Sequence, residues 1–344
     1  MKIIDLVPPS PVSSIAVPAA SHKFSQSDLP FYRKLGRTDL TVSCLGIGGG
    51  GHISSEDTLY AFDQGINYFF YSSDLHHYLY SSMADALRQL CGSGSSVREQ
   101  VVLATVAYMV RGPHAIATSL YDQVVELGVD YIDIFFWGWI DAQNATDFEK
   151  CLSASNDLRG PNRVYQRVIE NMFGASELLK KMGIVRYVGA SFHDHDLAAQ
   201  YLDSPLLDVV MVRHNPAHRH AQQKIFPHLD AQNPQRPGMV TFKSTGMGTY
   251  LWEPPRGLPA ACWRPSPPDL YRYSLSQNCV DVALAGLKRR QEIDEAIACV
   301  QQGKLTPAEL DYLNLYGDLH RNRVKIQDIP SKRLLYRPQL ALPA

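Results

Sequence analysis

The sequence has almost no excess of charge, no patterned cysteines and no long apolar run. Its six cysteines form no Cys-x-x-Cys pair and no regular spacing, so they indicate buried thiols in a reducing compartment rather than a disulfide framework. The 33 basic and 34 acidic residues leave a net charge of −1, too little to hold nucleic acid or an anionic membrane surface. No apolar run reaches the roughly 18 residues of a membrane-spanning helix. These absences predict a cytoplasmic protein with a small-molecule partner, no nucleic acid and no membrane contact, and they leave the oligomeric state open.

A regular alternation of segments is present instead. From about Phe31 onward, short runs of β-branched and aromatic residues alternate with segments of helical period. Near-continuous hydrophobicity within each run is typical of strands that are covered on both faces, as in a parallel sheet. The eight candidate strands begin at Ser43, Ile66, Val101, Tyr131, Val185, Leu207, Met239 and Val280. Eight strand–helix repeats favour closure, so we predict an α/β fold of the (β/α)8 TIM-barrel type.

The predicted barrel domain spans residues 31–325, between a flexible N-terminal arm (1–30) and a C-terminal tail (326–344). The arm is interrupted by prolines and serines and lacks the continuous apolar core of a signal peptide. Two stretches break the strand–helix rhythm, a polar one over 141–163 and a proline-rich one from Leu251. Both follow the carboxyl ends of predicted strands, where loops of this kind often face the substrate.

Capping residues and glycines mark the ends of several predicted helices. Ser54 and Asp57 form a capping-box pattern at the start of one helix. Glycine signals end this helix and three others at Gly65, Gly128, Gly183 and Gly317. The run GIGGGG matches the Gly-x-Gly-x-x-Gly pattern of dinucleotide sites, but no acidic residue stands ~20 positions on at the end of a second strand. We interpret these glycines as a tight loop at a strand exit.

Titratable side chains gather just after the predicted strands. The second strand runs directly into Asp74, His76, His77 and Tyr78. Five further histidines follow the fifth and sixth strands, namely His193, His195, His214, His218 and His220. In a barrel all these positions share one rim, where they supply either acid/base groups or metal ligands.

Other polar residues at the strand ends have more than one interpretation. Asp194 and Asp196 open a helix, and helix capping alone would explain them. Lys243 lies within the predicted seventh strand, and alternation puts it on the same side as Thr241. On a barrel interior, such a lysine is an imine-forming amine, an anion-binding cation or a member of a structural ion pair.

Six stretches of the chain resemble the aldo/keto reductase family. In order they are YRKLGRTDLTVSCLGIGGG, GINYFFYSSD, LGVDYIDIFFW, KKMGIVRYVGASF, DVVMVRHNPAHR and VDVALAGLKRRQEIDEAI, and together they cover nearly all of Tyr32 to Gly317. The resemblance implies a (β/α)8 barrel that binds NADPH in extended form at the carboxyl rim. It also implies hydride transfer to an aldehyde or ketone, with a tyrosine acid assisted by a lysine, a histidine and an aspartate.

None of these four catalytic residue types stands at the position that the resemblance assigns to it. The positions of the aspartate, tyrosine, lysine and histidine hold Phe70, Leu75, Val106 and Gly138. The stretch after the second strand offers a replacement, with Tyr78 or Tyr80 as the acid and an adjacent histidine to tune or relay the proton. The predicted catalytic residues are Tyr78, His77, His76 and Asp74.

The resemblance also assigns the cofactor contacts. Residues at the fifth and sixth strand ends would hold the nicotinamide, by its carboxamide and by stacking on the ring. The loop after the seventh strand would lie on the diphosphate side, and residues after the eighth would take the 2′-phosphate and adenine of NADP(H). The predicted cofactor-binding residues are Ser191, His214, Lys243, Ser244, Gly246, Lys288, Arg289 and Gln291.

Three functions fit these observations. The favoured hypothesis is an atypical NADP(H)-dependent oxidoreductase that transfers hydride to or from a small carbonyl or alcohol with a non-standard acid/base set, and it includes no metal site. The second is a metal-dependent lyase, isomerase or hydrolase, with Zn²⁺ or Fe²⁺ held by the histidine-rich rim around His193. The third is a non-catalytic, nucleotide-binding pseudoenzyme on the same barrel.

Overall fold

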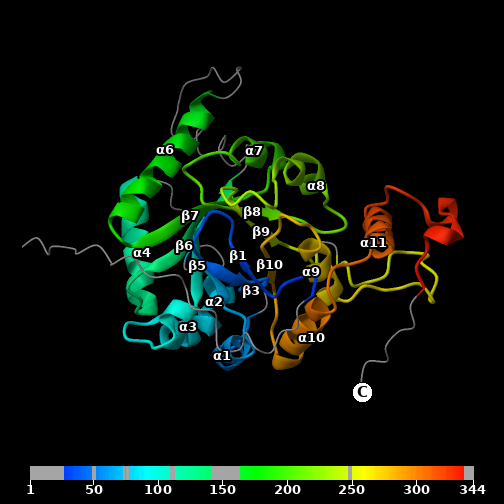
Figure 1. Cartoon of the computed structure of the whole chain (residues 1–344), viewed down its shortest axis with the longest axis horizontal. Helices are drawn as coiled ribbons and strands as arrows, with labels where there is room; N and C mark the ends of the chain where they lie inside the picture. The colour runs from blue at the N-terminus through cyan, green and yellow to red at the C-terminus, as the bar shows by residue number, and fades with distance from the viewer. Residues whose placement is uncertain are drawn as a thin grey trace, which may run out of the picture.

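Eight parallel strands close into a barrel, and helices surround it (Figure 1). The computed structural model describes residues 27–48, 52–72, 74, 77–108, 113–140, 163–246 and 250–336. The barrel strands are β3 (Leu45–Gly48), β4 (Tyr68–Ser72), β5 (Val102–Ala107), β6 (Ile132–Ile140), β7 (Val185–Phe192), β8 (Val209–Arg213), β9 (Gly238–Phe242) and β10 (Val282–Ala285). They follow one another around the barrel in chain order, and β10 closes it against β3. Each of the eight predicted runs overlaps one strand, so the predicted (β/α)8 barrel is confirmed.

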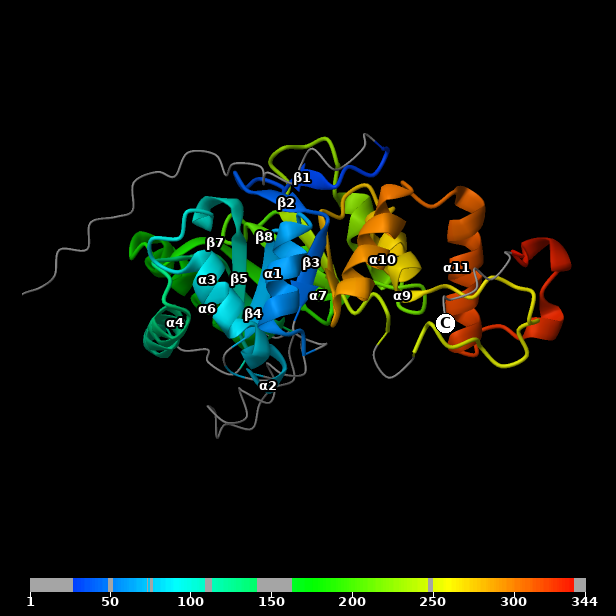
Figure 2. The same cartoon turned by 90° about the horizontal axis from the view of Figure 1, so that it is seen from below.

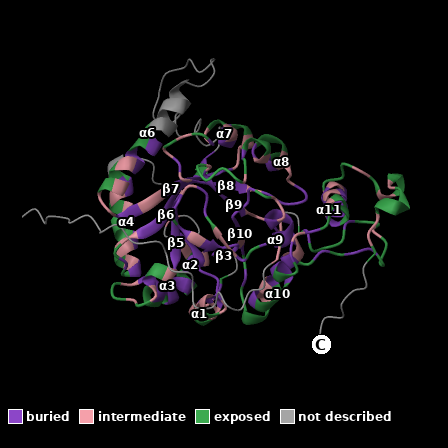
Figure 3. Cartoon of the chain, viewed as in Figure 1, coloured by how far each residue is buried: buried purple, intermediate pink, exposed green. Residues whose placement is uncertain are grey.

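The helices around the barrel turn buried residues toward it and exposed residues to solvent (Figure 3). The α-helices are α1 (Ser55–Asp63), α2 (His77–Tyr80), α3 (Ala84–Cys91), α4 (Pro113–Leu127), α6 (Arg163–Lys181), α7 (His195–Gln200), α8 (His220–Lys224), α9 (Pro267–Leu275), α10 (Arg290–Gln301) and α11 (Pro307–His320). Of these, α11 lies to one side of the barrel (Figure 1). Short 3-10 turns are η3 (Ser81–Met83), η4 (Arg98–Gln100), η5 (Phe226–His228), η6 (Ile326–Asp328) and η7 (Ser331–Arg333). Among the described residues, no helix combines the length and the apolar character needed to cross a membrane.

Most helix-end signals act as the sequence predicts. The Ser54 side chain accepts a hydrogen bond from the backbone N–H of Asp57 and caps α1. Asp194 caps α7 in the same way through the backbone N–H of Leu197. The prediction that α11 stops at Gly317 is wrong, because the helix continues to His320. A Cβ at Gly317 would collide with the carbonyl of Pro216, so this glycine permits close packing and does not end the helix.

A two-stranded hairpin that the sequence did not reveal covers one end of the barrel. It pairs β1 (Tyr32–Lys34) with β2 (Thr41–Ser43) in antiparallel fashion. Its turn is fixed to the barrel by the backbone N–H of Arg37, which donates to the Arg236 carbonyl over 2.8 Å. Figure 2 shows the hairpin at the end opposite α2, so the C-terminal ends of the strands remain open.

The described residues of the predicted N-terminal arm and C-terminal tail both contact the folded part of the chain. Leu29 is buried, and the Asp28 carboxylate accepts the backbone N–H of Lys304 over 2.9 Å. At the other end, η6 and η7 follow α11, and the Leu335 carbonyl accepts the backbone N–H of Trp263 over 2.7 Å. The described parts of residues 1–30 and 326–344 therefore pack against the rest of the chain.

An acidic or amide side chain at the start of every second barrel strand accepts a backbone N–H from the barrel strand before it or, for Asn67, from Ser43 at the end of β2. We call these four residues the floor clips, and they are Asn67, Asp133, Asp208 and Asp281. Their side-chain oxygens accept the backbone N–H groups of Ser43, Leu103, Val188 and Met239 over 2.7 to 2.9 Å. Each clip fixes the register of one strand pair at the closed end of the barrel.

The three acidic floor clips also hold cations. Asp133 is fully buried and lies 2.9 Å from an Arg98 nitrogen and 3.0 Å from an Arg186 nitrogen. Asp281 takes both arms of the Arg236 guanidinium, and Asp208 pairs with Lys180 over 2.7 Å. Buried charges are tolerated here because every carboxylate is both hydrogen-bonded and paired.

We predict that Asp133→Asn lowers the free energy of unfolding by about 3–5 kcal/mol, because it leaves two partly buried guanidinium groups without their shared carboxylate. Urea unfolding monitored by far-ultraviolet circular dichroism measures the loss. The matched control is Asp311→Asn, which breaks an exposed ion pair to Arg333 and changes stability by at most about 1 kcal/mol. A loss for Asp133→Asn no larger than the control's would contradict the role given to this clip.

Candidate functional site

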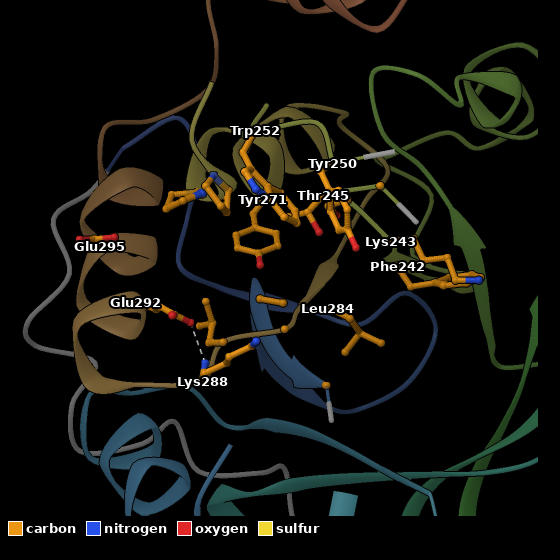
Figure 4. Close-up of a pocket in the computed structure, with 18 of the residues that line it drawn as sticks. Phe242, Lys243, Thr245, Tyr250, Trp252, Tyr271, Leu284, Lys288, Glu292 and Glu295 are labelled. Atoms are coloured by element: carbon orange, nitrogen blue, oxygen red, sulfur yellow. Dashed lines mark hydrogen bonds between the residues drawn. The ribbon is translucent and has the colours of Figure 1, made fainter. Parts of the chain in front are cut away.

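A cavity of about 710 Å³ opens at the C-terminal ends of β3, β9 and β10 (Figure 4). Its size lies within the range of small-molecule and cofactor sites. Tyr80 is among its lining residues, and in Figure 4 Phe242 and Lys243 lie on one side of it, with Lys288, Glu292 and Glu295 on the other. Between them lie the loop over 244–246, the first turn of α9 and the end of β10.

The loop after β9 makes a tight turn into the cavity. Lys243 has a positive φ of 59°, which a non-glycine residue adopts only when its surroundings enforce it. Its carbonyl accepts the Asn215 side-chain amide over 2.8 Å and the backbone N–H of Gly246 over 3.0 Å. Because β9 ends at Phe242, the predicted alternation with Thr241 does not set the direction of the lysine. The turn brings Lys243, Ser244 and Gly246 to the cavity, as the predicted cofactor loop requires.

The start of α10 supplies the charged end of the cavity. The Glu292 carboxylate accepts the backbone N–H of Lys288 over 2.8 Å and a guanidinium nitrogen of Arg289 over 3.1 Å. Lys288, Glu292 and Glu295 line the cavity, whereas Arg289 and Gln291 do not. The Gln291 amide instead donates to Glu295 over 2.9 Å along the helix surface. Of the two predicted 2′-phosphate contacts, Lys288 lines the cavity and Arg289 does not.

The three predicted catalytic residues that the structure describes, Asp74, His77 and Tyr78, do not line the cavity. Tyr78 is 65% exposed, and its ring lies 6.0 Å from that of His52. His77 lies 3.1 Å from Glu126. The Asp74 carboxylate accepts the backbone N–H of Tyr108 over 2.6 Å, and His76 lies outside the described residues.

Tyr80, which the prediction set aside in favour of Tyr78, lines the cavity. It is only 8% exposed, and its ring lies 6.1 Å from that of Phe70. Burial raises the pKa of Tyr80 to about 12, and a hydrogen bond from Tyr108 opposes that rise. The reason for the exchange is local, because residues two apart on a helix point to opposite sides and α2 turns Tyr80 inward. Recognising a helical turn in HYLY would have identified it.

The positions that the family resemblance assigns to the catalytic set are filled by close packing. The Phe70 ring lies 5.9 Å from that of Phe136. A Cβ at Gly138 would lie 2.5 Å from the Tyr108 ring and 2.7 Å from the Val106 side chain. Leu75 lies outside the described residues. The Tyr108 ring thus occupies the space in front of Gly138, and no larger side chain fits there unless it moves.

Two predicted nicotinamide contacts lie outside the cavity lining. The Ser191 hydroxyl accepts the backbone N–H of Trp139 over 2.8 Å. His214 is fully buried, and its ring already stacks on that of Tyr273 at 5.2 Å. Burial lowers the pKa of His214 to about 3, so the ring is neutral at pH 7, and its Nε2 atom is buried with no hydrogen-bond partner.

The rim histidines have other contacts, and the rings of His195 and His220 lie 6.0 Å apart. His195 Nε2 lies 3.0 Å from the Arg213 carbonyl, and His218 lies beside the Asn215 side chain. Asp194 is committed to its helix cap, and Asp196 pairs with Lys224. Across the described part of the chain, no three His, Cys, Asp or Glu side chains lie close enough to hold a metal ion. The described residues therefore offer the metal-dependent alternative no ligand set.

A closed (β/α)8 barrel with a cavity of cofactor size at the carboxyl ends of its strands has the architecture of a barrel enzyme. A family comparison is consistent with this class, because residues 54–250, more than half of the chain, match the aldo/keto reductase family. The chain therefore belongs to the aldo/keto reductases, a family of oxidoreductases.

Solved structures show the same fold at low sequence identity. An aldo-keto reductase from Bacillus halodurans, in its holo form, superposes with a TM-score of 0.60 at 20% identity, over 83% of this chain and 95% of that one. A protein from Pseudomonas aeruginosa assigned to the aldo-keto reductases gives 0.57 at 17% identity, over 81% and 98%. No curated protein matches the sequence.

We predict that, in His214→Phe, the free energy of unfolding falls less steeply as the pH drops below about 6.5. A histidine whose pKa falls from 6.5 when unfolded to about 3 when folded takes up its proton only on unfolding, so stability falls as pH drops from 6.5 towards 3. Each such group contributes a slope of about 1.4 kcal/mol per pH unit. His193 and His218, both lowered to about 4, keep part of the slope in the variant. Urea unfolding at pH 7, 6 and 5 measures it, and equal slopes for both proteins would contradict the prediction.

Proposed function

We propose that the protein is an NADP(H)-dependent oxidoreductase that transfers hydride to or from a small carbonyl or alcohol, with Tyr80 as its acid. The observation that carries this proposal is the cavity itself. In a barrel of this family, it joins a backbone loop, a cation and a buried tyrosine along one continuous wall.

The residues along the cavity suit a dinucleotide in extended form. Ser244 and Gly246 present a tight polar turn on the diphosphate side, and Tyr271 offers an aromatic wall. At the far end, the Glu292 charge is compensated by Arg289, whereas no described side chain forms an ion pair with the Lys288 ammonium. That ammonium would hold the 2′-phosphate of NADP(H). The nicotinamide of the bound cofactor supplies or accepts the hydride, which is chemistry that side chains lack.

Tyr80 is the described residue best placed to exchange a proton at this cavity. Its pKa of about 12 keeps it protonated at neutral pH, so it can donate to a carbonyl oxygen that gains negative charge. The Tyr108 hydroxyl, hydrogen-bonded to Tyr80, stabilises the tyrosinate left behind. Asp74 helps to hold Tyr108 in place by accepting its backbone N–H. Asp74 is thus a positioning residue in this scheme.

A second candidate function has its own supporting observation. Phe70, Val106 and the Tyr108 ring fill the space at the positions assigned to the catalytic set, and such packing also suits a barrel that binds nucleotide without turning over a substrate. The two candidates share cofactor binding and differ in the need for Tyr80.

We predict that Lys288→Gln weakens NADPH binding about tenfold and leaves NADH binding within about twofold, because it removes one charge-assisted contact to the 2′-phosphate. Titration of the purified protein, followed by nicotinamide fluorescence, measures both affinities. Lys332→Gln, which changes an exposed lysine in η7, is the matched control. An equal loss of affinity for NADPH and NADH would show that Lys288 does not contact the 2′-phosphate. No binding of either cofactor at about 1 mM would overturn the proposed function.

We predict that Tyr80→Phe lowers kcat/KM for aldehyde reduction by about 100-fold or more, while NADPH affinity stays within about twofold, because only the proton donor is lost. Tyr78→Phe is the matched control, since its ring faces solvent two residues away. Steady-state rates with an aldehyde panel provide the measurement. Undiminished turnover in Tyr80→Phe would exclude it as the acid, and NADPH binding without turnover of any panel member would favour the non-catalytic candidate.

A further inference from the structure

Three cationic or titratable side chains lie at the ends of three adjacent barrel strands. His193 directly follows β7, Arg213 is the last residue of β8, and Lys243 directly follows β9. The strands are paired up to these ends, with Phe192 beside Val212 and Arg213 beside Phe242. We call Arg213 and Lys243 the rim cations; the pKa of His193, lowered to about 4 by burial and by its charged neighbours, leaves its ring neutral at pH 7 and able to donate a hydrogen bond beside them.

The rim cations have no acidic partner among the described residues. The described ion pairs include neither Arg213 nor Lys243, and His193 forms none. At the opposite end of the barrel, by contrast, Arg98, Arg186 and Arg236 all pair with buried carboxylates. Among the residues that the structure describes, the arginines at the closed end are thus paired with carboxylates, whereas Arg213 and Lys243 at the open end are not.

The rim cations are close enough to oppose one another's charge. Burial, and then the charge of Arg213, lower the pKa of Lys243 to about 8. Burial, and then Lys243 and Arg213, lower that of His193 to about 4. The pKa of Arg213 is lowered by burial and by Arg321. No acidic group of the described residues contributes to these shifts, so an anion placed beside the rim cations would relieve their repulsion.

The surroundings of the rim cations are aromatic and rigid. The His193 ring lies 5.5 Å from that of Phe242 and 6.0 Å from that of Trp139. The Lys243 ammonium lies 5.3 Å from the Phe242 ring centroid, and the positive φ of Lys243 is fixed by Asn215. Apolar walls of this kind suit the body of a small carbonyl compound, and fixed cations suit its charged group.

We propose that His193, Arg213 and Lys243 form an anion subsite that selects carbonyl substrates carrying a carboxylate or a phosphate group. The assignment to substrate rests on the proposed oxidoreductase function. Of the three, only Lys243 lines the cavity that would hold the cofactor. In Figure 4 its ammonium points away from Lys288, toward Phe242. The subsite thus lies on the side of the barrel mouth opposite the predicted 2′-phosphate contact.

Isothermal titration with benzoate and with inorganic phosphate tests the subsite without any need for turnover. We expect one of the two anions to bind the purified protein. Binding of benzoate would indicate that the substrate carries a carboxylate, and binding of phosphate would indicate that it carries a phosphate group. Arg213→Gln and Lys243→Gln should each weaken that binding about tenfold or more, Lys243→Arg should largely retain it, and Lys332→Gln should leave it unchanged. Circular dichroism checks that each variant is folded. A dissociation constant above about 10 mM for both anions, or equal affinity in the glutamine variants, overturns the subsite.

Repeating the titration with saturating NADPH separates substrate from cofactor. Anion binding that persists supports the substrate assignment, and displacement of the anion by NADPH assigns the cations to the cofactor's phosphates and overturns it. If the anion binds through Arg213 and Lys243 but NADPH does not bind, the anion subsite is supported and the proposed oxidoreductase function is overturned. The two proposals therefore fail in different measurements.

Discussion

The barrel depends on a carboxylate or amide that holds a neighbouring strand's backbone N–H at the start of every second strand. Parallel pairing alone leaves the first amides of each strand unsatisfied at the barrel end, and unsatisfied buried amides are costly. Asn67, Asp133, Asp208 and Asp281 satisfy four of them and thereby pair the strands two by two. The three acidic clips also explain the arginines and the lysine beside them, because a buried carboxylate requires a partner of opposite charge.

The two ends of the barrel differ in their treatment of charge. At the closed end, polar groups satisfy one another, and the β1–β2 hairpin covers them. At the open end, tight turns and short helices place tyrosine and lysine side chains around a cavity. The closed end holds the strands in register, and as a result the side chains of separate strands meet at fixed positions at the open end. Such a division is typical of barrel enzymes, in which stability and chemistry occupy opposite faces.

Local patterns in the sequence predicted the strands and most helix boundaries, because these depend on nearest neighbours and periodicity. Relations between distant segments were not predictable in this way. Gly317 has the same local signature as a helix stop, and only its approach to Pro216, a hundred positions earlier, gives it another role. The β1–β2 hairpin was missed because its strands have three residues each, too few to show a period.

The candidate site shows the same limit on a smaller scale. The sequence pointed to the stretch after β4, and one turn of helix decides that Tyr80 and not Tyr78 lines the cavity. Arg213 drew no attention, because an arginine at a strand end resembles ordinary surface charge until its neighbours are known. His214 resembled a stacking platform, and its stacking partner proved to be Tyr273, sixty residues away.

The C-terminal segment gives the cavity mouth an unusual support. Tyr316 donates to the Glu253 carbonyl, Tyr312 donates to the Trp263 carbonyl, and the backbone N–H of Trp263 donates to Leu335. The proline-rich loop that carries Trp252 to the cavity is therefore anchored by α11 and the residues after it, which lie to one side of the barrel in Figure 1. Docking of the segment after α11 therefore supports a loop that lines the cavity. A ligand that contacted this loop only in its docked form would favour that docking to the same degree as the docking favours the ligand.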